Sequence, residues 1–272
     1  MSEPRRGQLT ALILAGQREG RVDAFAAEMG QTYKCLVPVA GEPMILHVVR
    51  SLAACEEVGD ILISANAAAS LEDLPPIAAL IAAGGLQILP AKPNLVDSVM
   101  AALAGRRFPV LVTTADNVLL SPHAVAELHD RAQVAEADIA VAFARRQSVL
   151  AAHSDGQRRF YRFADDAYSN CNSYWLGSAQ ALRPVEIFRQ GGQFAKHPWR
   201  IVQAFGLLNL LLLLTHRLSL HGAARRISRR FNVALAAVVL ADGSQAIDVD
   251  NLRSHGIAEL LLTERAPQAE AA

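Results

Sequence analysis

Residues 9–21, which read LTALILAGQREGR, decide how this chain folds. Leu9–Ala15 is a short apolar run typical of a buried β-strand, and Gly16 opens a polar loop directly after it. A glycine-containing loop that leaves a buried strand can turn its backbone N–H groups toward a phosphate. Arg21 and, further along the chain, Lys34 can neutralise the charge of that phosphate. Taken alone, the segment is also consistent with an ordinary surface loop.

The same strand and helix alternation continues through the first half of the chain, which is typical of a mainly parallel sheet covered by helices. We therefore predict an α/β fold with a mainly parallel, doubly wound, Rossmann-like sheet. The predicted strands are Leu9–Ala15, Asp60–Ala65, Leu86–Leu89, Pro109–Thr114 and Ile139–Ala144. The predicted helices are Met44–Ala54, Leu71–Gly84, Leu95–Gly105 and Pro122–Glu136, of which the last has Ser121 as its cap.

The second half alternates less regularly. It predicts strands at Arg159–Phe163, Asn172–Leu176, Ala234–Leu240 and Gln245–Val249, helices at Ser178–Gln190 and Asn251–Leu262, and a frayed tail from Glu264. The length of 272 residues suits one domain, 1–272, that carries an insertion.

Composition excludes several classes of protein. Apolar residues make up 52% of the chain and charged residues 19%, which excludes disordered and coiled-coil chains. The formal net charge is zero, which argues against nucleic acid as a partner. Three widely spaced cysteines provide neither a zinc motif nor a disulfide framework, and no segment resembles a secretory leader. We expect a cytoplasmic protein.

The first loop continues into KCLVPVAGEPM at residues 34–44, and the chain contains only three lysines, Lys34, Lys92 and Lys196. Together the two segments resemble the signature of the nucleotidyltransferases of the glycosyltransferase-A-like fold. This group includes sugar-phosphate, molybdenum-cofactor and isoprenoid-precursor nucleotidyltransferases. The resemblance implies that Leu14, Ala15 and Gly16 bind the nucleotide and that Arg21 and Lys34 are catalytic. The sequence of this chain differs from the signature at Gln17, where the family usually has a second glycine.

A second motif is VLVTTADN at residues 110–117. Ligands of open α/β sheets bind at the carboxyl ends of the strands, and a carboxylate there suits Mg²⁺. Asp116 has this position, although a lone Asp there is more often a turn or cap residue. The run resembles the metal-binding strand of the same family, which implies that Asp116 is a ligand of Mg²⁺. Asn117 differs from the Asp-x-Asp pattern of many sugar transferases.

A third motif is AIDVDN at residues 246–251. Two carboxylates spaced by two residues on a strand point to the same face, so both can reach one cation. The resemblance implies that Asp250 is the second metal ligand, with Asp248 in reserve. The alternative is that Asp250 caps the last helix.

Two shorter segments concern the substrates. Asp97 and Ser98 open a predicted helix and resemble the base-contacting segment of the isoprenoid-precursor cytidylyltransferases, which slightly favours CTP over GTP; helix capping explains them equally well. Asn172 ends a predicted strand facing the nucleotide loop, and we expect it to contact the acceptor. Cys171 lies beside it and is interpreted as a packing residue.

Residues 183–231 form a basic and apolar insertion that the resemblance does not explain. Residues 183–230 contain nine Lys or Arg and one Glu. Helical spacing places Leu220, Ala224, Ile227 and Phe231 on one face and two rows of arginines (Arg225, Arg226, Arg229 and Arg230) on another. Three interpretations remain open: a helix packed on the sheet or on a second subunit of a homodimer, a membrane-surface contact through 197–231, and an arginine cluster for the acceptor's phosphate.

The resulting hypothesis is a Mg²⁺-dependent nucleotidyltransferase that moves an NMP from an NTP to a phosphorylated small molecule or lipid precursor and releases pyrophosphate. A membrane contact would place it at the inner face of the membrane. The alternatives are a nucleotide-sugar-dependent glycosyltransferase of the same fold and a non-catalytic, membrane-recruited module.

Overall fold

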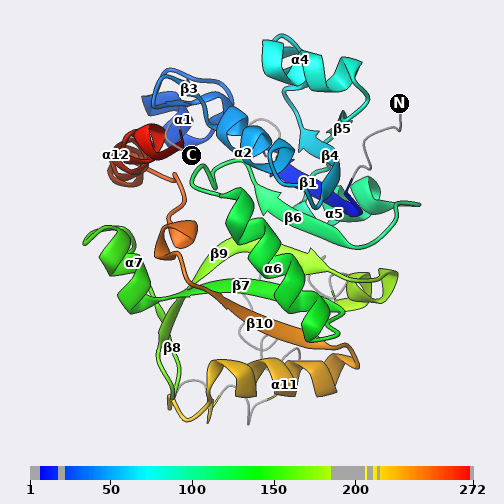
Figure 1. Ribbon diagram of the computed structural model, residues 1–272, viewed down its shortest axis with the longest axis vertical. Coiled ribbons are helices and arrows are strands. Elements are labelled where there is room, and N and C mark those ends of the chain that lie inside the picture. The colour runs from blue at the N-terminus through cyan, green and yellow to red at the C-terminus, as the bar shows by residue number, and fades with distance from the viewer. Residues whose placement is uncertain (1–6, 18–21, 185–205, 207–210, 213–214, 270–272) are drawn as a thin grey trace.

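The fold is built on one mixed sheet with helices on both faces (Figure 1). The computed structural model describes residues 7–17, 22–184, 206, 211–212 and 215–269. Its strand order is β10-β7-β9-β6-β1-β4-β5, with β8 paired to β9, while β2 and β3 form a separate hairpin. Every pair in the large sheet is parallel except those of β9 with β6, β7 and β8. The predicted fold class is confirmed.

The strands are β1 (Leu9–Ala15), β2 (Pro38–Val39), β3 (Glu42–Pro43), β4 (Val58–Ala65), β5 (Leu86–Pro90), β6 (Val110–Thr114), β7 (Ile139–Arg145), β8 (Tyr161–Arg162), β9 (Ala167–Leu176) and β10 (Leu235–Leu240). The α-helices are α1 (Ala24–Glu28), α2 (Met44–Ala53), α3 (Ala68–Glu72), α4 (Pro75–Ala82), α5 (Leu95–Leu103), α6 (Pro122–Val134), α7 (Arg146–Ala152), α11 (Leu220–Phe231) and α12 (Leu252–Ala269). The described residues also include the 3₁₀ helices η1 (Lys34–Leu36), η2 (Ala179–Ala181) and η4 (Gly243–Ala246).

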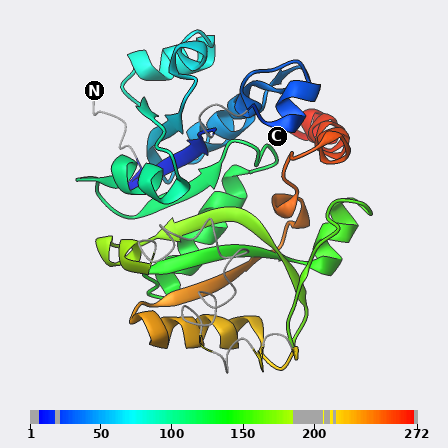
Figure 2. The same ribbon diagram turned by 180° about the vertical axis from the view of Figure 1, so that it is seen from behind.

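The central strands bury both of their faces, which is why they read as continuous apolar runs. In β1, Ala11 and Ile13 join the larger core with α2 and α6, while Leu12 points to the opposite face and packs with α5. Figure 2 shows the sheet from behind, with the face opposite to α6 toward the viewer. Because β1 pairs in parallel with both β4 and β6, the carboxyl ends of these three strands lie at one edge of the sheet.

Two predicted helices differ from the structure for local reasons. The predicted helix Leu71–Gly84 is divided into α3 and α4, because Pro75 forces Leu74 into an extended conformation and offers no N–H for a continuous helix. The helix predicted at Ser178–Gln190 begins as η2 with Ser178 as its cap, and its residues from 185 onward lie outside the described part of the chain.

The strand predicted at Gln245–Val249 is wrong. Only Gln245 and Ala246 of this segment have regular structure, as the end of η4, whose cap Asp242 accepts a hydrogen bond from Ser244 N at 2.9 Å. Gly243 lies against the backbone of Ser148, where a Cβ atom would come within 2.1 Å of the carbonyl carbon. Because this close approach turns the chain, Asp248 and Asp250 lie on an irregular segment rather than on a strand.

The frayed tail predicted at Glu264–Ala272 is wrong for residues 264–269, which belong to α12, while residues 270–272 lie outside the described part of the chain. The guanidinium of Arg265 donates to Leu119 O at 2.8 Å and to Asp242 Oδ2 at 3.1 Å, which anchors the later turns of the helix to the body of the protein.

The described part of the insertion includes α11, which lies along the edge strand β10 (Figure 1). Leu220 and Ala224 are buried, and Phe231 packs against the core on this side of the sheet. Ser228 Oγ accepts a hydrogen bond from Leu235 N at 2.9 Å, so the helix also caps part of the open strand edge. The apolar face of α11 is therefore used within the fold, as the packing interpretation predicts.

Among the described residues, we find no helix both long and apolar enough to cross a membrane.

The three cysteines are buried and unpaired, and burial raises the pKa of the Cys35 and Cys55 thiols to about 12. They are packing residues, as predicted for Cys171.

Ala224→Asp should lower the free energy of unfolding by about 2–4 kcal/mol, because it places an unpaired charge in the contact between α11 and the sheet. Arg225→Asp, on the exposed side of the same helix, should change it by no more than about 0.5 kcal/mol. Chemical denaturation measures both values. Equal effects would show that α11 does not pack as described.

Candidate functional site

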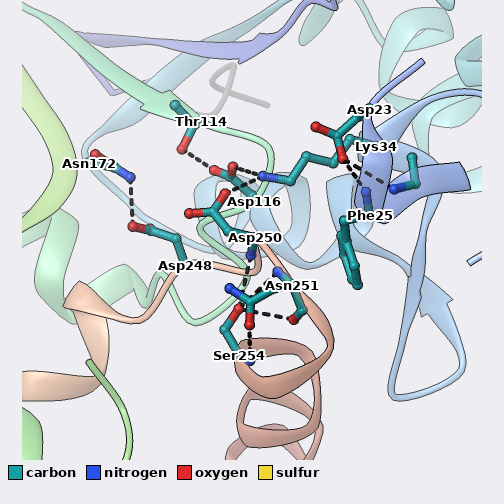
Figure 3. A network of polar contacts seen from close by, with 11 residues as sticks. Asp23, Phe25, Lys34, Thr114, Asp116, Asn172, Asp248, Asp250, Asn251 and Ser254 are labelled. Atoms are coloured by element: carbon teal, nitrogen blue, oxygen red, sulfur yellow. Dashed lines mark hydrogen bonds and ion pairs between the residues drawn. The ribbon is translucent and has the colours of Figure 1, made fainter. Parts of the chain in front are cut away.

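Three segments that are far apart in the sequence meet at the carboxyl edge of the sheet (Figure 3). Lys34 begins η1, Asp116 follows β6, and Asp250 precedes α12. The ammonium nitrogen of Lys34 lies 2.5 Å from Asp116 Oδ2 and 2.5 Å from Asp250 Oδ1. The structure therefore brings together one predicted catalytic residue and both of the principal predicted metal ligands.

Backbone hydrogen bonds hold these segments in register. Ala115 N donates to Leu14 O at 3.1 Å, which joins the end of β1 to the segment that follows β6. Val249 N donates to Asp116 O at 3.0 Å, so the two aspartates of the 248–250 segment flank Asp116. The position of the three carboxylates thus depends on main-chain contacts rather than on flexible side chains.

Asn251, rather than Asp250, caps α12. Asn251 Oδ1 accepts a hydrogen bond from Ser254 N at 3.2 Å, and Ser254 Oγ accepts one from Asp250 N at 3.0 Å. The Asp250 carboxylate is left free of helix capping, and its side chain is 65% exposed where it meets Lys34. This resolves the alternative interpretation of Asp250 as a cap.

The charges of the site favour a cation between the two carboxylates. Burial acts to lower the pKa of Lys34, but the negative charges of Asp116 and Asp250 and their hydrogen bonds outweigh it and raise the pKa above its ordinary value. Lys34 is therefore positively charged at neutral pH, and its ammonium is held between the two carboxylates.

Thr114 orients Asp116 and was not identified from the sequence. Its hydroxyl donates to Asp116 Oδ1 at 2.5 Å, while Oδ2 of the same carboxylate faces Lys34 (Figure 3). Threonine is common in strands, so only its position two residues before the aspartate, at the end of a buried strand, could have singled it out.

Asn117 is a structural residue. Its side-chain amide is fully buried and donates to Cys171 O at 3.1 Å and to Thr113 Oγ1 at 3.2 Å. It therefore ties the end of β6 to the antiparallel strand β9, which explains an Asn at this position without a role in metal binding.

Asp248 and Asp250 do not act on the same partner. Asp248 Oδ2 accepts a hydrogen bond from Asn172 Nδ2 at 2.7 Å, and its Oδ1 is buried without a hydrogen-bond partner. Burial, and then the charges of Asp116 and Asp250, raise the pKa of Asp248 well above its ordinary value. Asn172 reaches Asp248 from the middle of β9 with a left-handed backbone (φ 46°), close to an irregularity in the pairing of β7 with β9.

The nucleotide loop is described up to Gln17, and Arg21 lies outside the described residues. A Cβ atom at Gly16 would lie 2.9 Å from the Cβ of Ala91, so the close approach of the loop that follows β5 favours glycine here. Gln17 N donates to Asn66 Oδ1 at 2.6 Å, and Gln17 Nε2 donates to Thr32 O at 3.2 Å. Asn66, directly after β4, is a second residue at this edge that the sequence analysis missed.

Asp97 and Ser98 take part in capping α5. Asp97 N donates to Asn94 Oδ1 at 2.8 Å, and Ser98 Oγ accepts from Lys92 N at 2.9 Å. Ser98 is buried, so these contacts shape the turn before the helix. Asn94 is the cap of α5, and contact of Asp97 and Ser98 with a nucleotide base stays a prediction.

The donor set fits Mg²⁺ bound jointly with a phosphate ligand. Within the described ranges, no group of three or more His, Cys, Asp or Glu side chains is arranged to hold a metal ion. Asp116 and Asp250 nevertheless converge on one cation, the Lys34 ammonium. Mg²⁺ is commonly held by one or two carboxylates, with phosphate oxygens and water completing its shell.

Known proteins share sequence and fold features with this chain. A family model described as the MobA-like NTP transferase domain matches residues 11–195. No curated protein sequence shows significant similarity to the chain. A solved structure described as a hypothetical transferase from Thermus thermophilus is 26% identical and has a TM-score of 0.77, with 92% of this chain and 99% of that chain covered.

Two more distant structures show the same fold. A 4-diphosphocytidyl-2C-methyl-D-erythritol synthase from Anaerococcus prevotii is 9% identical with a TM-score of 0.56, with 94% of this chain and 96% of that chain covered. A CMP:2-keto-3-deoxy-manno-octonic acid synthetase in complex with CTP is 14% identical with a TM-score of 0.52, with 98% and 100% covered.

Substitution of Asn172 separates its two contributions to stability. Asn172→Ala should cost about 2–3 kcal/mol, because it removes the hydrogen bond to Asp248 and puts alanine at a positive φ. Asn172→Gly loses the same hydrogen bond but tolerates the backbone conformation, so it should be about 1 kcal/mol less costly. Urea denaturation tests the difference, and a glycine variant less stable than the alanine variant would contradict it.

Proposed function

This chain belongs to the family of MobA-like NTP transferase domains and is a nucleotidyltransferase, and we propose that it uses Mg²⁺ to move an NMP from an NTP to a phosphorylated acceptor. The observation that carries the proposal is the convergence of Lys34, Asp116 and Asp250 on one point beside the loop that follows β1. A lysine and two carboxylates at this edge suit a triphosphate and its metal ion.

In the proposed reaction, an acceptor oxygen attacks the α-phosphorus of the NTP. The bond from that phosphorus to the oxygen bridging to the β-phosphate breaks, and pyrophosphate leaves with the electron pair. Lys34 and Arg21 bind the phosphate oxygens and stabilise the charge that develops on them. Asp116 and Asp250 would hold Mg²⁺, which when bound would supply further positive charge beside the phosphates.

A phosphorylated acceptor needs no general base, because its phosphate is already ionised at neutral pH. Asn172 is proposed to lie on the acceptor side. Its position on β9, with its amide held by Asp248 next to Asp116 and Asp250, supports this assignment. Catalysis then depends mainly on positioning and on electrostatic stabilisation.

CTP is proposed as the nucleotide over GTP. The support is the resemblance of the Asp97-Ser98-Val99 segment to that of cytidylyltransferases, together with the fold shared with a synthetase complexed with CTP. Leu14, Ala15 and Gly16 are proposed to line the nucleotide site, since the first two end β1 beside Ala115 and Gly16 follows directly.

A contact of residues 197–231 with anionic membrane is a further part of the hypothesis, supported by the charge of α11. Charge reversal at Arg225, Arg226, Arg229 and Arg230 should abolish co-sedimentation with anionic liposomes. If charge reversal leaves co-sedimentation unchanged, a lipid precursor as acceptor loses this support.

A homodimer is likewise a proposal, and sedimentation equilibrium tests it by measuring the mass of the protein in solution.

Nucleotide binding should be visible as thermal stabilisation, because a ligand that binds only the native state raises the Tm. Among ATP, CTP, GTP and UTP, each with and without Mg²⁺, we expect CTP with Mg²⁺ to raise the Tm by roughly 5–10 °C at 100 times its Kd. Asp116→Ala should lose the shift. Asp130→Ala, an exposed carboxylate on α6, should keep it.

The preferred nucleotide then enters a screen of phosphorylated acceptors in which pyrophosphate release is measured. Release that requires both substrates and Asp116 supports the proposal. The absence of a shift with every nucleotide at millimolar concentration would contradict it, and binding of a nucleotide-sugar without release of pyrophosphate would indicate a glycosyltransferase.

Thr114 is proposed as a positioning residue that acts through Asp116. Thr114→Val should lower kcat by about tenfold, because it removes the hydrogen bond that orients the carboxylate, and Thr114→Ser should restore most of it. The Tm of both variants should remain close to that of the wild type. A valine variant with full kcat, or a serine variant as slow as valine, would contradict this role.

A further inference from the structure

The Lys34 ammonium lies in the space where the two carboxylates would hold a metal ion. It is within hydrogen-bonding distance of one oxygen of Asp116 and one oxygen of Asp250, each at 2.5 Å (Figure 3). The remaining oxygen of Asp116 is engaged by Thr114. The carboxylate oxygens that converge on a single point are therefore the two that Lys34 occupies.

A divalent ion and the ammonium group cannot share this position. Both carry positive charge, and like charges within a few ångströms repel strongly at a partly buried site. Lys34 and Asp116 are each largely shielded from water, with side chains that are 22% and 20% exposed. A metal ion that binds alone must therefore displace a charge-assisted hydrogen-bonded pair on each side of Lys34.

A bound triphosphate changes the competition between the Lys34 ammonium and a metal ion for the two carboxylates. It brings negative oxygens to the loop after β1, which is joined to Ala115 by the main chain and so lies beside the same carboxylates. The lysine side chain has a flexible four-carbon stem and can transfer its ammonium from a carboxylate to a phosphate without backbone movement. The carboxylates are then available to the metal ion.

We propose that Lys34 is an internal substitute for the metal ion: it neutralises Asp116 and Asp250 until a triphosphate attracts its ammonium, and only then does a divalent ion bind between them. The inference rests on the proposed function. It makes the affinities for metal ion and nucleotide mutually dependent, because each improves when the other is bound. It also means that the free enzyme has low affinity for divalent ions.

Binding of Mn²⁺ without nucleotide, measured by electron paramagnetic resonance, tests this directly. Lys34→Met retains much of the side-chain volume but removes the charge, and it should bind Mn²⁺ at least about tenfold more tightly than the wild type. Lys34→Arg keeps the charge and should bind as weakly as the wild type. Lys92→Met, which changes the net charge equally at an exposed position outside the site, should also match the wild type.

The tighter Mn²⁺ binding of Lys34→Met must come from the carboxylates of Asp116 and Asp250. Lys34→Met combined with Asp250→Asn should therefore lose it. Equal Mn²⁺ affinity of wild type and Lys34→Met, or equal gains in Lys34→Met and Lys92→Met, would overturn the inference. Because the assay requires no turnover, tighter Mn²⁺ binding by Lys34→Met combined with no pyrophosphate release by the wild type would contradict the proposed function alone.

A second measurement uses the intact wild type, in case Lys34→Met does not fold. The chain contains three lysines, so ¹³Cε-labelled lysine gives three side-chain signals, and Lys92→Met and Lys196→Met identify that of Lys34 by elimination. Millimolar Mg²⁺ alone should leave the Lys34 signal unchanged, whereas Mg²⁺ with CTP should shift it. A shift of the same size with Mg²⁺ alone would overturn the inference.

Discussion

The ion pairs of Lys34 with Asp116 and Asp250 are the interaction on which the rest of the site depends. They connect the beginning, the middle and the end of the chain at one point, with both distances at 2.5 Å. Burying ionised side chains costs free energy unless each of them has a partner of opposite charge or a hydrogen-bond partner. Here the ammonium lies between two carboxylates, and one of these is also held by Thr114. The arrangement is thus satisfied within the protein and remains close to solvent through Asp250.

The sheet supplies the precision that this group requires. Parallel strands β1 and β6 end side by side, and the hydrogen bond from Ala115 N to Leu14 O extends their pairing beyond the last strand residue. The bond from Val249 N to Asp116 O attaches the returning chain to the same edge. A short 3₁₀ helix and a cap on α12 then place Lys34 and Asp250. Main-chain hydrogen bonds thus hold the site in place, which suits the proposed electrostatic catalysis.

Local signals in the sequence were sufficient for most elements. The strand Leu9–Ala15 is predicted to the residue because a buried parallel strand is an uninterrupted apolar run. The start of α6 is also predicted correctly because Ser121 and Pro122 mark it, although the helix ends at Val134 rather than at Glu136. The division of the helix predicted at Leu71–Gly84 has a local cause, Pro75, whereas other errors arose where long-range contacts decide the structure. The turn at Gly243 depends on Ser148, and the final turns of α12 depend on Leu119 and Asp242. For the site, the charged residues were apparent from their motifs, whereas Thr114 and the pairing of Asp248 with Asn172 required the folded structure.

Anomalous diffraction from crystals grown with Mn²⁺ and CTP would test the central claim most directly. The account predicts one strong anomalous peak between the carboxylates of Asp116 and Asp250, with the Lys34 ammonium moved onto a phosphate oxygen of the nucleotide. A nucleotide bound at the loop after β1 with Lys34 still between the two carboxylates, and with Mn²⁺ elsewhere, would contradict it.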